Sequence, residues 1–294
     1  MRALRRVSLG QRRLLAVTGA DRREFLQGLV TGDLRRLSRE RAIWAALLTP
    51  QGKYLFDFFL VEGNGDALLL ETDAERAEAL RARLSMYRLR AKVEILDPGD
   101  GWEVTAIFGE GAPSAFGLAD EPGAARPLGE GVLFVDPRHL RLGLRLLLPR
   151  GPAVPAPVAA VEEAPFAAYE DLRLALGVPD SRDLVVERSL PLEFNFFELG
   201  GVAFDKGCYI GQEVTARMKH RGRLRKRLLP VEIRGTAKPG DVVVAAGGRE
   251  AGTLRSVLGG RGLALLRLDH LRDELRTGEA VILPRPPEWL KLQE

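Results

Sequence analysis

A single cysteine, Cys208, constrains how this chain of 294 residues can fold. One thiol excludes a disulfide within the chain and any metal site built from several thiolates of one chain. The three histidines, His139, His220 and His270, are too far apart in sequence to show the spacing of a zinc site. The composition is 46% hydrophobic and 29% charged. We therefore expect a globular protein that folds around an apolar core, with no permanently bound metal.

The same cysteine bears on the compartment. A lone free thiol is typical of a reducing environment, so we expect a cytoplasmic protein. The N-terminus carries arginines, but its longest apolar run, residues 14–17, is too short for a secretion signal. No stretch approaches the roughly 20 apolar residues of a membrane span, so we expect no membrane association. The formal net charge of +4 suits an anionic ligand.

The first 225 residues alternate between helical and strand patterns, which predicts an α+β fold. A helix of about ten residues is expected after a cap at Thr18 or Asp21, and Asp73 can cap another helix. Apolar runs on both sides of a Pro-Gln-Gly turn predict a hairpin over residues 42–62. A Pro-rich connection is expected at 149–160. Further predicted helices cover 74–87, 164–177 and 210–222, and further predicted strands cover 67–72, 92–96 and 103–108.

Near residue 225 the pattern changes. Short β-rich runs separated by Gly and Pro follow at 227–235, 241–247, 250–259 and 262–268. Such runs are typical of a small barrel or sandwich. We therefore predict two domains, which cover residues 1–225 and 226–294.

Cys208 lies in the segment 204–213, FDKGCYIGQE, just before a predicted helix. A helix N-terminus and the nearby Lys206 both favour the thiolate, the reactive and metal-binding form. The alternative is a small buried hydrophobe, the usual role of a free cysteine. A third possibility is a nucleophile with His220 as its base, although nothing in the sequence brings the two together. The other motif residues considered as part of the site are Lys206, Gly207, Tyr209, Gly211, Gln212 and Glu213.

Residues 206–213, KGCYIGQE, resemble the signature of the YgfZ family, which is related to the aminomethyltransferase (T protein) of the glycine cleavage system. Mitochondrial relatives of that family serve iron–sulfur cluster assembly. The resemblance extends over nearly the whole chain, from the opening segment at 15–34 to the start of the predicted barrel at 221–233. It implies a folate-binding region of three subdomains around a channel, followed by a small C-terminal β-barrel.

The resemblance also implies tetrahydrofolate, or a derivative of it, as the ligand. Glu193 matches the position at which a carboxylate would accept the two adjacent donors of a pterin edge. Asp57 aligns with an aspartate near the reactive folate nitrogens, and a carboxylate in an apolar strand is costly without a partner. The alternatives are an exposed loop carboxylate for Glu193 and the polar face of a strand for Asp57.

A basic run holds seven Lys and Arg between residues 217 and 227. By resemblance, some of them, with Arg227 as the candidate, meet the glutamate tail of folate. The alternative is a solvated helix face and loop. Because no aromatic residues are interleaved for base stacking, we expect no stable nucleic-acid binding.

Three functions follow. The resemblance implies a folate-dependent accessory protein that assembles or repairs clusters in iron–sulfur clients, including radical enzymes that modify tRNA. One thiolate cannot hold a four-iron cluster alone, so Cys208 would share a cluster with a partner protein or act in redox exchange. The second is an aminomethyltransferase of the glycine cleavage system, which would make the chain an enzyme, but the T proteins lack the KGCYIGQE motif. The third is a basic RNA-binding module, which predicts salt-dependent affinity.

Overall fold

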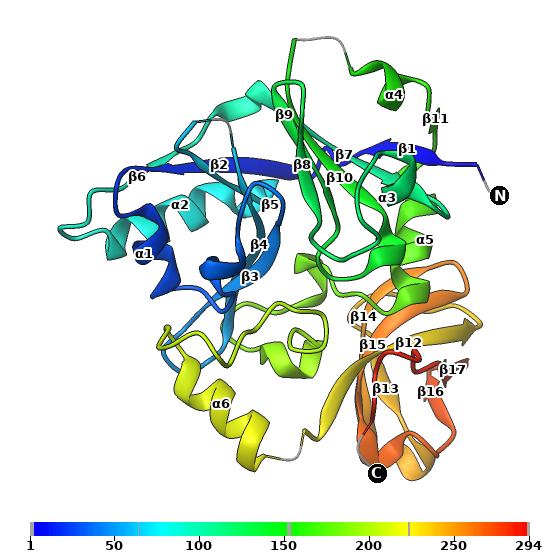
Figure 1. Cartoon of the computed structure of the whole chain (residues 1–294). Coiled ribbons are helices and arrows are strands. Elements are labelled where there is room, and N and C mark those ends of the chain that lie inside the picture. Colours follow the sequence, from blue (N-terminus) through cyan, green and yellow to red (C-terminus); the bar gives the residue numbers. More distant parts are fainter. Residues whose placement is uncertain (1–2, 64, 152–153, 223, 293–294) are drawn as a thin grey trace. The chain divides into compact units, whose positions relative to one another are not determined.

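The structure is a computed structural model of the chain, which describes residues 3–63, 65–151, 154–222 and 224–292 (Figure 1). Two compact units make up the chain, and each is described by itself. The predicted boundary at 225–226 coincides with the start of a barrel strand at Lys226, but the units combine segments that are distant in sequence. The first consists of Met1–Leu48, Leu55–Tyr169 and Gly200–Ile210, and the second of Thr49–Tyr54, Glu170–Leu199 and Gly211–Glu294.

The first unit contains a five-stranded and a six-stranded sheet. The five-stranded sheet has the order β3-β4-β5-β2-β6, and the predicted hairpin forms its neighbouring strands β3 and β4. Gly52, with φ 74°, lies in the turn between them, in a conformation that favours glycine. The strands are β2 (Arg12–Thr18), β3 (Ile43–Leu48), β4 (Tyr54–Glu62), β5 (Leu68–Asp73) and β6 (Glu94–Leu96).

The six-stranded sheet has the order β11-β1-β7-β10-β9-β8. Its neighbouring strands are antiparallel apart from the parallel pair of β1 and β11. The sequence patterns predicted β7 of this sheet but not its other strands. The strands are β1 (Arg5–Ser8), β7 (Trp102–Phe108), β8 (Ala125–Leu128), β9 (Gly131–Val135), β10 (Leu144–Pro149) and β11 (Glu162–Glu163).

Short helices complete the first unit. Asp73 caps a 3-10 turn, η2 (Ala74–Arg76), that leads into α2 (Ala77–Tyr87). Leu80 and Leu84 of α2 join the apolar core that also contains Phe58 of β4 and Leu70 of β5, so this helix covers one face of the five-stranded sheet. The other helices are α1 (Arg22–Gln27), η1 (Leu34–Arg36), η3 (Gly99–Gly101), α3 (Ala112–Ala115), η4 (Leu140–Leu142) and α4 (Ala156–Ala159).

The second unit is built on a closed barrel with the strand order β12-β15-β14-β13-β16-β17, which confirms the predicted C-terminal barrel. Inward-facing side chains such as Leu229, Leu254 and Ile282 form its core. The last two strands were not predicted. The strands are β12 (Lys226–Arg234), β13 (Val242–Val244), β14 (Glu250–Leu258), β15 (Arg261–Arg267), β16 (Leu275–Thr277) and β17 (Ala280–Pro284).

The remaining helices lie before and within the barrel sequence. The predicted helix over 164–177 is α5 (Phe166–Leu176), which ends before Gly177 at φ 74°. The helix predicted after the cysteine motif is α6 (Gln212–Arg221), seen in yellow in Figure 1. The short 3-10 turns are η5 (Ser181–Asp183), η6 (Pro191–Phe194), η7 (Ala246–Gly248) and η8 (Leu268–His270).

Candidate functional site

Cys208 is exposed to solvent, which rejects the alternative of a buried hydrophobe. It follows Gly207, whose φ of 89° favours glycine. A Cβ atom added at Gly207 would have no neighbour within 4 Å. The thiol thus lies in an open part of the segment Gly200–Ile210, which packs within the first unit. A thiol in this position is accessible to a partner or a metal cluster.

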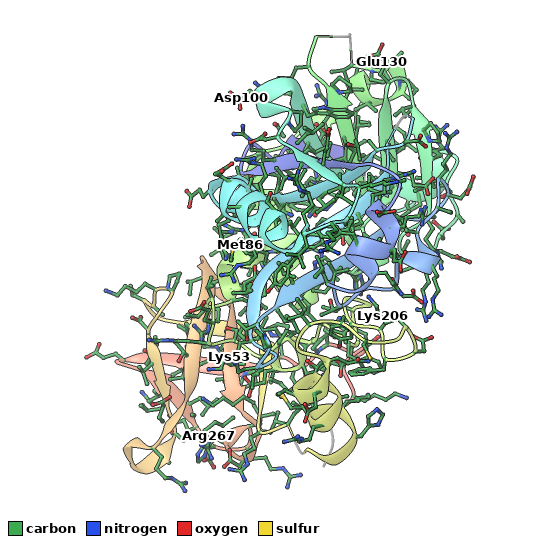
Figure 2. The ribbon with its side chains drawn as sticks, turned by 90° about the vertical axis from the view of Figure 1, so that its left-hand side faces the viewer. Lys53, Met86, Asp100, Glu130, Lys206 and Arg267 are labelled. Atoms are coloured by element: carbon green, nitrogen blue, oxygen red, sulfur yellow. The ribbon has the colours of Figure 1, made fainter. Side chains whose placement is uncertain are left out.

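Lys206 anchors this segment through buried hydrogen bonds. Its side chain is buried, and its Nζ donates hydrogen bonds of 2.6 Å each to the carbonyl oxygens of Val30 and Gly32. Burial lowers the pKa of the Lys206 ammonium to about 8. The same ammonium lies 5.3 Å from the centre of the Tyr209 ring. The lysine that the sequence places beside the thiol therefore holds the backbone. Lys206 is labelled in Figure 2.

Asp205 anchors the same segment at the surface, through a hydrogen bond and an ion pair. Its carbonyl accepts a hydrogen bond from Arg35 Nη2 at 2.7 Å, and its carboxylate pairs with Arg36 Nη2 at 2.7 Å. Asp33 orients Arg35, and the hydrogen bonds that Arg35 donates lower the pKa of Asp33 to about 2. The backbone before Cys208 is thus attached to the turn η1 at two points, and the cysteine follows these attachments.

The rest of the motif builds the start of α6. Gly211 is the N-cap residue at φ 83°, and its carbonyl accepts a hydrogen bond from Thr215 Oγ1 at 3.0 Å. Gln212 is the first helical residue, and Glu213 pairs with Arg217 at 2.7 Å along the exposed face. Glu213, one of the motif residues considered as part of the site, thus forms a surface ion pair, whose contribution to stability is small.

Asp57 lies on β4, and its carboxylate is engaged within the protein. The residue is buried, and Asp57 Oδ2 accepts a hydrogen bond of 3.0 Å from Trp44 Nε1. Its backbone carbonyl accepts another from Thr72 Oγ1 at 3.1 Å. A buried carboxylate that accepts a hydrogen bond within the protein has a structural explanation that does not require a ligand.

A buried ion network occupies the same unit. Arg145 bridges two carboxylates, with 2.6 Å to Glu71 and 3.0 Å to Asp136. Arg138 also pairs with Asp136 at 2.7 Å, and Arg12 pairs with Glu71 at 2.7 Å. Burial alone would raise the pKa of Asp136, but Arg138 and Arg145 together lower it. The charges therefore stabilise one another, as buried charges require.

Glu193 lies on the turn η6 in the second unit and is half-buried. Burial raises the pKa of its carboxyl group, against the opposing effect of Lys226, Arg255 and Arg227. Among the described residues, no hydrogen bond or ion pair engages this carboxylate. A half-buried carboxylate without a partner is free to accept donors from a ligand.

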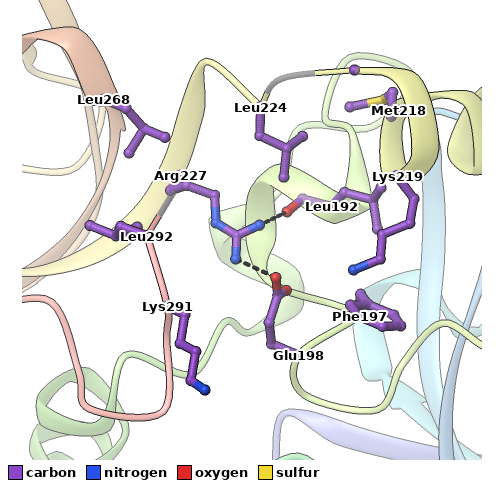
Figure 3. A pocket seen from close by; sticks show the side chains of 11 residues that line it. Leu192, Phe197, Glu198, Met218, Lys219, Leu224, Arg227, Leu268, Lys291 and Leu292 are labelled. Atoms are coloured by element: carbon purple, nitrogen blue, oxygen red, sulfur yellow. Dashed lines mark hydrogen bonds and ion pairs between the residues drawn. The ribbon is translucent and has the colours of Figure 1, made fainter. Parts of the chain in front are cut away.

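Arg227 lies on β12 and lines a pocket (Figure 3). Its guanidinium donates to the carbonyl of Leu192 at 2.9 Å and pairs with Glu198 at 2.6 Å. Arg227 is buried, so the alternative of a solvated arginine is wrong for this residue. In the same basic run, Arg223 and the side chain of Arg221 lie outside the described part of the chain.

The candidate residues fall into two groups. Asp57 and the segment with Lys206 and Cys208 belong to the first unit, and Glu193 and Arg227 belong to the second. One functional candidate was missed, Lys291, which lines the pocket with Arg227. Its position near the end of the chain gave no signal in the sequence, because only the barrel fold brings it to Arg227.

Within the described ranges, no group of three or more His, Cys, Asp or Glu side chains is placed to hold a metal ion. Over the same ranges, no helix has both the length and the apolar character needed to cross a membrane.

The comparisons with known proteins decide the family. The human mitochondrial iron–sulfur cluster assembly factor IBA57 is 35% identical, over 96% of this chain and 84% of that protein. The chain belongs to the IBA57 family. The mouse protein of the same name is 36% identical over the same shares, and the homologue of the fungus Pyricularia oryzae is 33% identical over 92% of this chain and 74% of that protein.

Two further matches concern the fold. The CAF17 C-terminal beta-barrel domain matches residues 225–292. The glycine cleavage system aminomethyltransferase T of Bartonella henselae superposes with a TM-score of 0.80 over 99% of this chain and 87% of that protein, at 16% identity. The predicted fold, a T-protein-like region followed by a barrel, is confirmed. The family resemblance is confirmed at the level of iron–sulfur assembly factors, and these relatives carry the name IBA57 rather than YgfZ.

Proposed function

We propose that this protein assists the assembly or repair of iron–sulfur clusters in client enzymes, with the Cys208 thiol as its point of contact with a cluster or a client. The observation that carries the proposal is the exposed thiol on a segment fastened by Lys206 and Asp205. A fixed, accessible thiol can approach a partner without first reordering its own loop. The names of the relatives support the same role.

The chemistry at Cys208 is a ligand exchange. The Cys208 thiol gives up its proton, its thiolate sulfur bonds to one iron of the cluster, and the partner thiolate that it displaces from this iron takes up a proton and leaves as a thiol. The other positions stay with thiolates of the partner protein, because a cluster usually takes four. The cluster is cargo in this step, and the chain supplies one ligand of several.

A reconstitution assay tests this role. An apo four-iron client is supplied with ferrous iron, sulfide and thiol reductant, and its activity is followed with and without the protein. We expect the wild type to accelerate the recovery, and Cys208→Ala to lose the acceleration while its melting temperature stays unchanged. Equal acceleration by Cys208→Ala would refute the role of the thiol.

The second part of the proposal is that the protein binds tetrahydrofolate through Glu193. The unpartnered, half-buried carboxylate fits a pterin edge, whose ring N–H and amino group it would accept as a pair. Asp57 and Arg227 fit less well, because Trp44 and Glu198 already engage them. We therefore assign the ligand contact to Glu193 and no step of a reaction to the folate.

Calorimetric titration with tetrahydrofolate separates the two parts. Wild type and Cys208→Ala are expected to bind equally, and Glu193→Ala is expected to lose binding. Loss of binding in Cys208→Ala would contradict the separation of the two sites. Absence of binding to the wild type would remove folate from the proposal and leave the thiol role to be tested by reconstitution.

The proposed clients include radical enzymes that modify tRNA. Cells that lack this protein should then contain less of the tRNA nucleosides that such enzymes produce, as measured by mass spectrometry of digested tRNA. Normal amounts of these nucleosides would exclude this class of client.

A further inference from the structure

The turn that follows α2 has a surface that the proposed cluster and folate roles do not use. It consists of residues 88–92, Arg-Leu-Arg-Ala-Lys, which we call the α2 turn. A hydrogen bond of 2.8 Å from the Ala91 N–H to the Arg88 carbonyl closes it. Asp21 holds its other end, because Asp21 Oδ2 accepts a hydrogen bond of 2.8 Å from the Lys92 N–H. The backbone of the turn is therefore held in place before any partner binds.

The fold does not explain why residue 89 is a leucine. Leu89 has φ 43°, in the left-handed region that Gly, Asn or Asp adopts more readily than leucine. Its side chain is 89% exposed, so it adds almost nothing to the apolar core. Single exposed leucines are common, but this one also occupies a backbone conformation that leucine disfavours. Neither the turn nor the core accounts for it, which points to contact with another molecule.

Cations surround this leucine. Arg88, Arg90 and Lys92 are exposed, and Arg83 on the last turns of α2 is half-buried. Among the described residues, no carboxylate pairs with any of these four side chains. Exposed cations that the chain leaves unpaired are available to carboxylates of another molecule.

Two carboxylates flank the turn and do not cancel its charge. Asp21 is bound to the backbone of Lys92 rather than to a side chain of the turn. Glu94 is exposed and lies two residues after the turn. Four cations against two carboxylates leave a positive excess, which attracts an anionic surface.

We propose that the α2 turn is a docking surface for an acidic protein. The partner would place Asp or Glu side chains against Arg88 and Arg90 and would receive Leu89 in an apolar socket between them. Arginine pairs with a carboxylate through two parallel hydrogen bonds. An apolar anchor surrounded by polar contacts is a frequent form of an interface hot spot. This inference goes beyond the proposed function and does not depend on Cys208.

The composition of the turn favours a protein over two other anionic partners. An RNA would pair with the cations, but the turn has no aromatic side chain on which a base could stack. A face that binds an anionic membrane usually carries Trp or Phe, and residues 88–92 contain neither. Arginine is enriched in protein interfaces and lysine is depleted, and two of the three cations of the turn are arginines.

Photo-crosslinking of the full chain in its own cells tests this surface. The photoreactive residue p-benzoylphenylalanine replaces Ser85, which is exposed and precedes the turn, so that Leu89 and the cations stay intact. The control places it at Ser114, which is exposed elsewhere in the first unit. We expect a protein adduct from position 85 that position 114 does not give. The crosslinked peptide of the partner should contain several Asp or Glu residues.

The captured protein is then purified, and its affinity for the chain is measured by calorimetric titration. Leu89→Asn and Arg90→Glu should each weaken binding at least about tenfold, a difference of about 1.4 kcal/mol. Leu89→Asn should not lower the melting temperature, because asparagine adopts this backbone conformation more readily than leucine. Its weaker binding would therefore report a lost contact rather than a lost fold.

Matched controls make the same chemical changes elsewhere. Arg150 is exposed in the first unit and has no ion pair among the described residues, and Val242 is 51% exposed on β13. Arg150→Glu and Val242→Asn should bind the captured protein as the wild type does. Equal weakening by Arg150→Glu would show that net charge alone attracts the partner and would contradict a docking site.

The remaining outcomes also decide the question. The proposal is overturned if position 85 gives no protein adduct, if its adducts are only with phospholipid, RNA or a second copy of this chain, or if Leu89→Asn binds as the wild type does. Cys208→Ala is expected to give the same adduct as the wild type. Failure of the cluster role in reconstitution with an intact adduct would therefore leave this inference standing, and the reverse result would remove only this inference.

Discussion

Lys206 sets the geometry of the Cys208 segment. Its ammonium is buried and donates to the carbonyls of Val30 and Gly32, so its removal leaves two buried acceptors without their donor. We predict that Lys206→Met lowers the free energy of unfolding by about 2–3 kcal/mol, as measured by urea denaturation. Lys53→Met removes an exposed lysine and should change it by less than about 0.5 kcal/mol. Equal effects of the two changes would contradict a structural role for the hydrogen bonds of Lys206.

The same lysine predicts a pH dependence. Burial lowers its pKa in the folded protein from 10.5 to about 8. Between these values the unfolded chain binds more protons than the folded one at this residue, so stability rises with pH. The stability difference between wild type and Lys206→Met should therefore widen from pH 8 to pH 10.5 in urea titrations. A difference that narrows over this range would contradict the burial of a charged ammonium.

Glu193 predicts a pH dependence of stability opposite to that of Lys206. Its raised pKa means that the folded protein favours the protonated form, which contributes stability below the ordinary value of 4.5 that is lost as pH rises. Glu193→Gln should therefore stabilise the protein at pH 7, by roughly 0.5–2 kcal/mol. The gain should vanish below pH 4.5, as measured by thermal denaturation. A destabilised Glu193→Gln would indicate that the carboxylate has a structural partner.

At the scale of elements, one buried guanidinium links α5 to the barrel. Arg173 of α5 pairs with Glu170 and Asp183 at 2.6 Å each and donates to Ser256 of β14 at 3.1 Å. We predict that Arg173→Met costs about 3–5 kcal/mol, because Asp183 is left as a buried charge. The partly exposed Arg182 shares the Glu170 carboxylate. Arg182→Met should cost no more than about 1 kcal/mol in the same denaturation assay, and a comparable loss would reject the assignment.

Periodicity predicted the elements that have a one-sided apolar pattern. The helices α5 and α6 were found within about two residues of their bounds, since each combines such a pattern with a glycine at one end. The helix predicted after Thr18 is shorter than expected, because α1 already ends at Gln27, before Gly28. The strands β9 and β10 are short and pair with each other through contacts that only the folded sheet defines.

At the scale of the whole molecule, the sequence predicted the cysteine motif but not the pocket that Arg227 lines. The segment KGCYIGQE indicated Cys208 because its residues are contiguous in sequence. The pocket depends on Lys219 and Lys291, which the fold of the second unit brings together. The buried ion network that includes Arg145 and Asp136 was also missed. A charged residue in a strand pattern is expected to face solvent, because the sequence does not show which residue pairs with it in the folded protein.

The most direct test of the proposed function is the activity of a four-iron enzyme in cells that lack this protein. The cells are complemented with wild type, Cys208→Ser or Met86→Leu at matched protein levels. Met86 is the control because it is also exposed and carries sulfur. We predict that Met86→Leu restores the activity fully and that Cys208→Ser restores no more than the empty vector does. Full restoration by a folded Cys208→Ser protein would contradict a cluster role for the thiol.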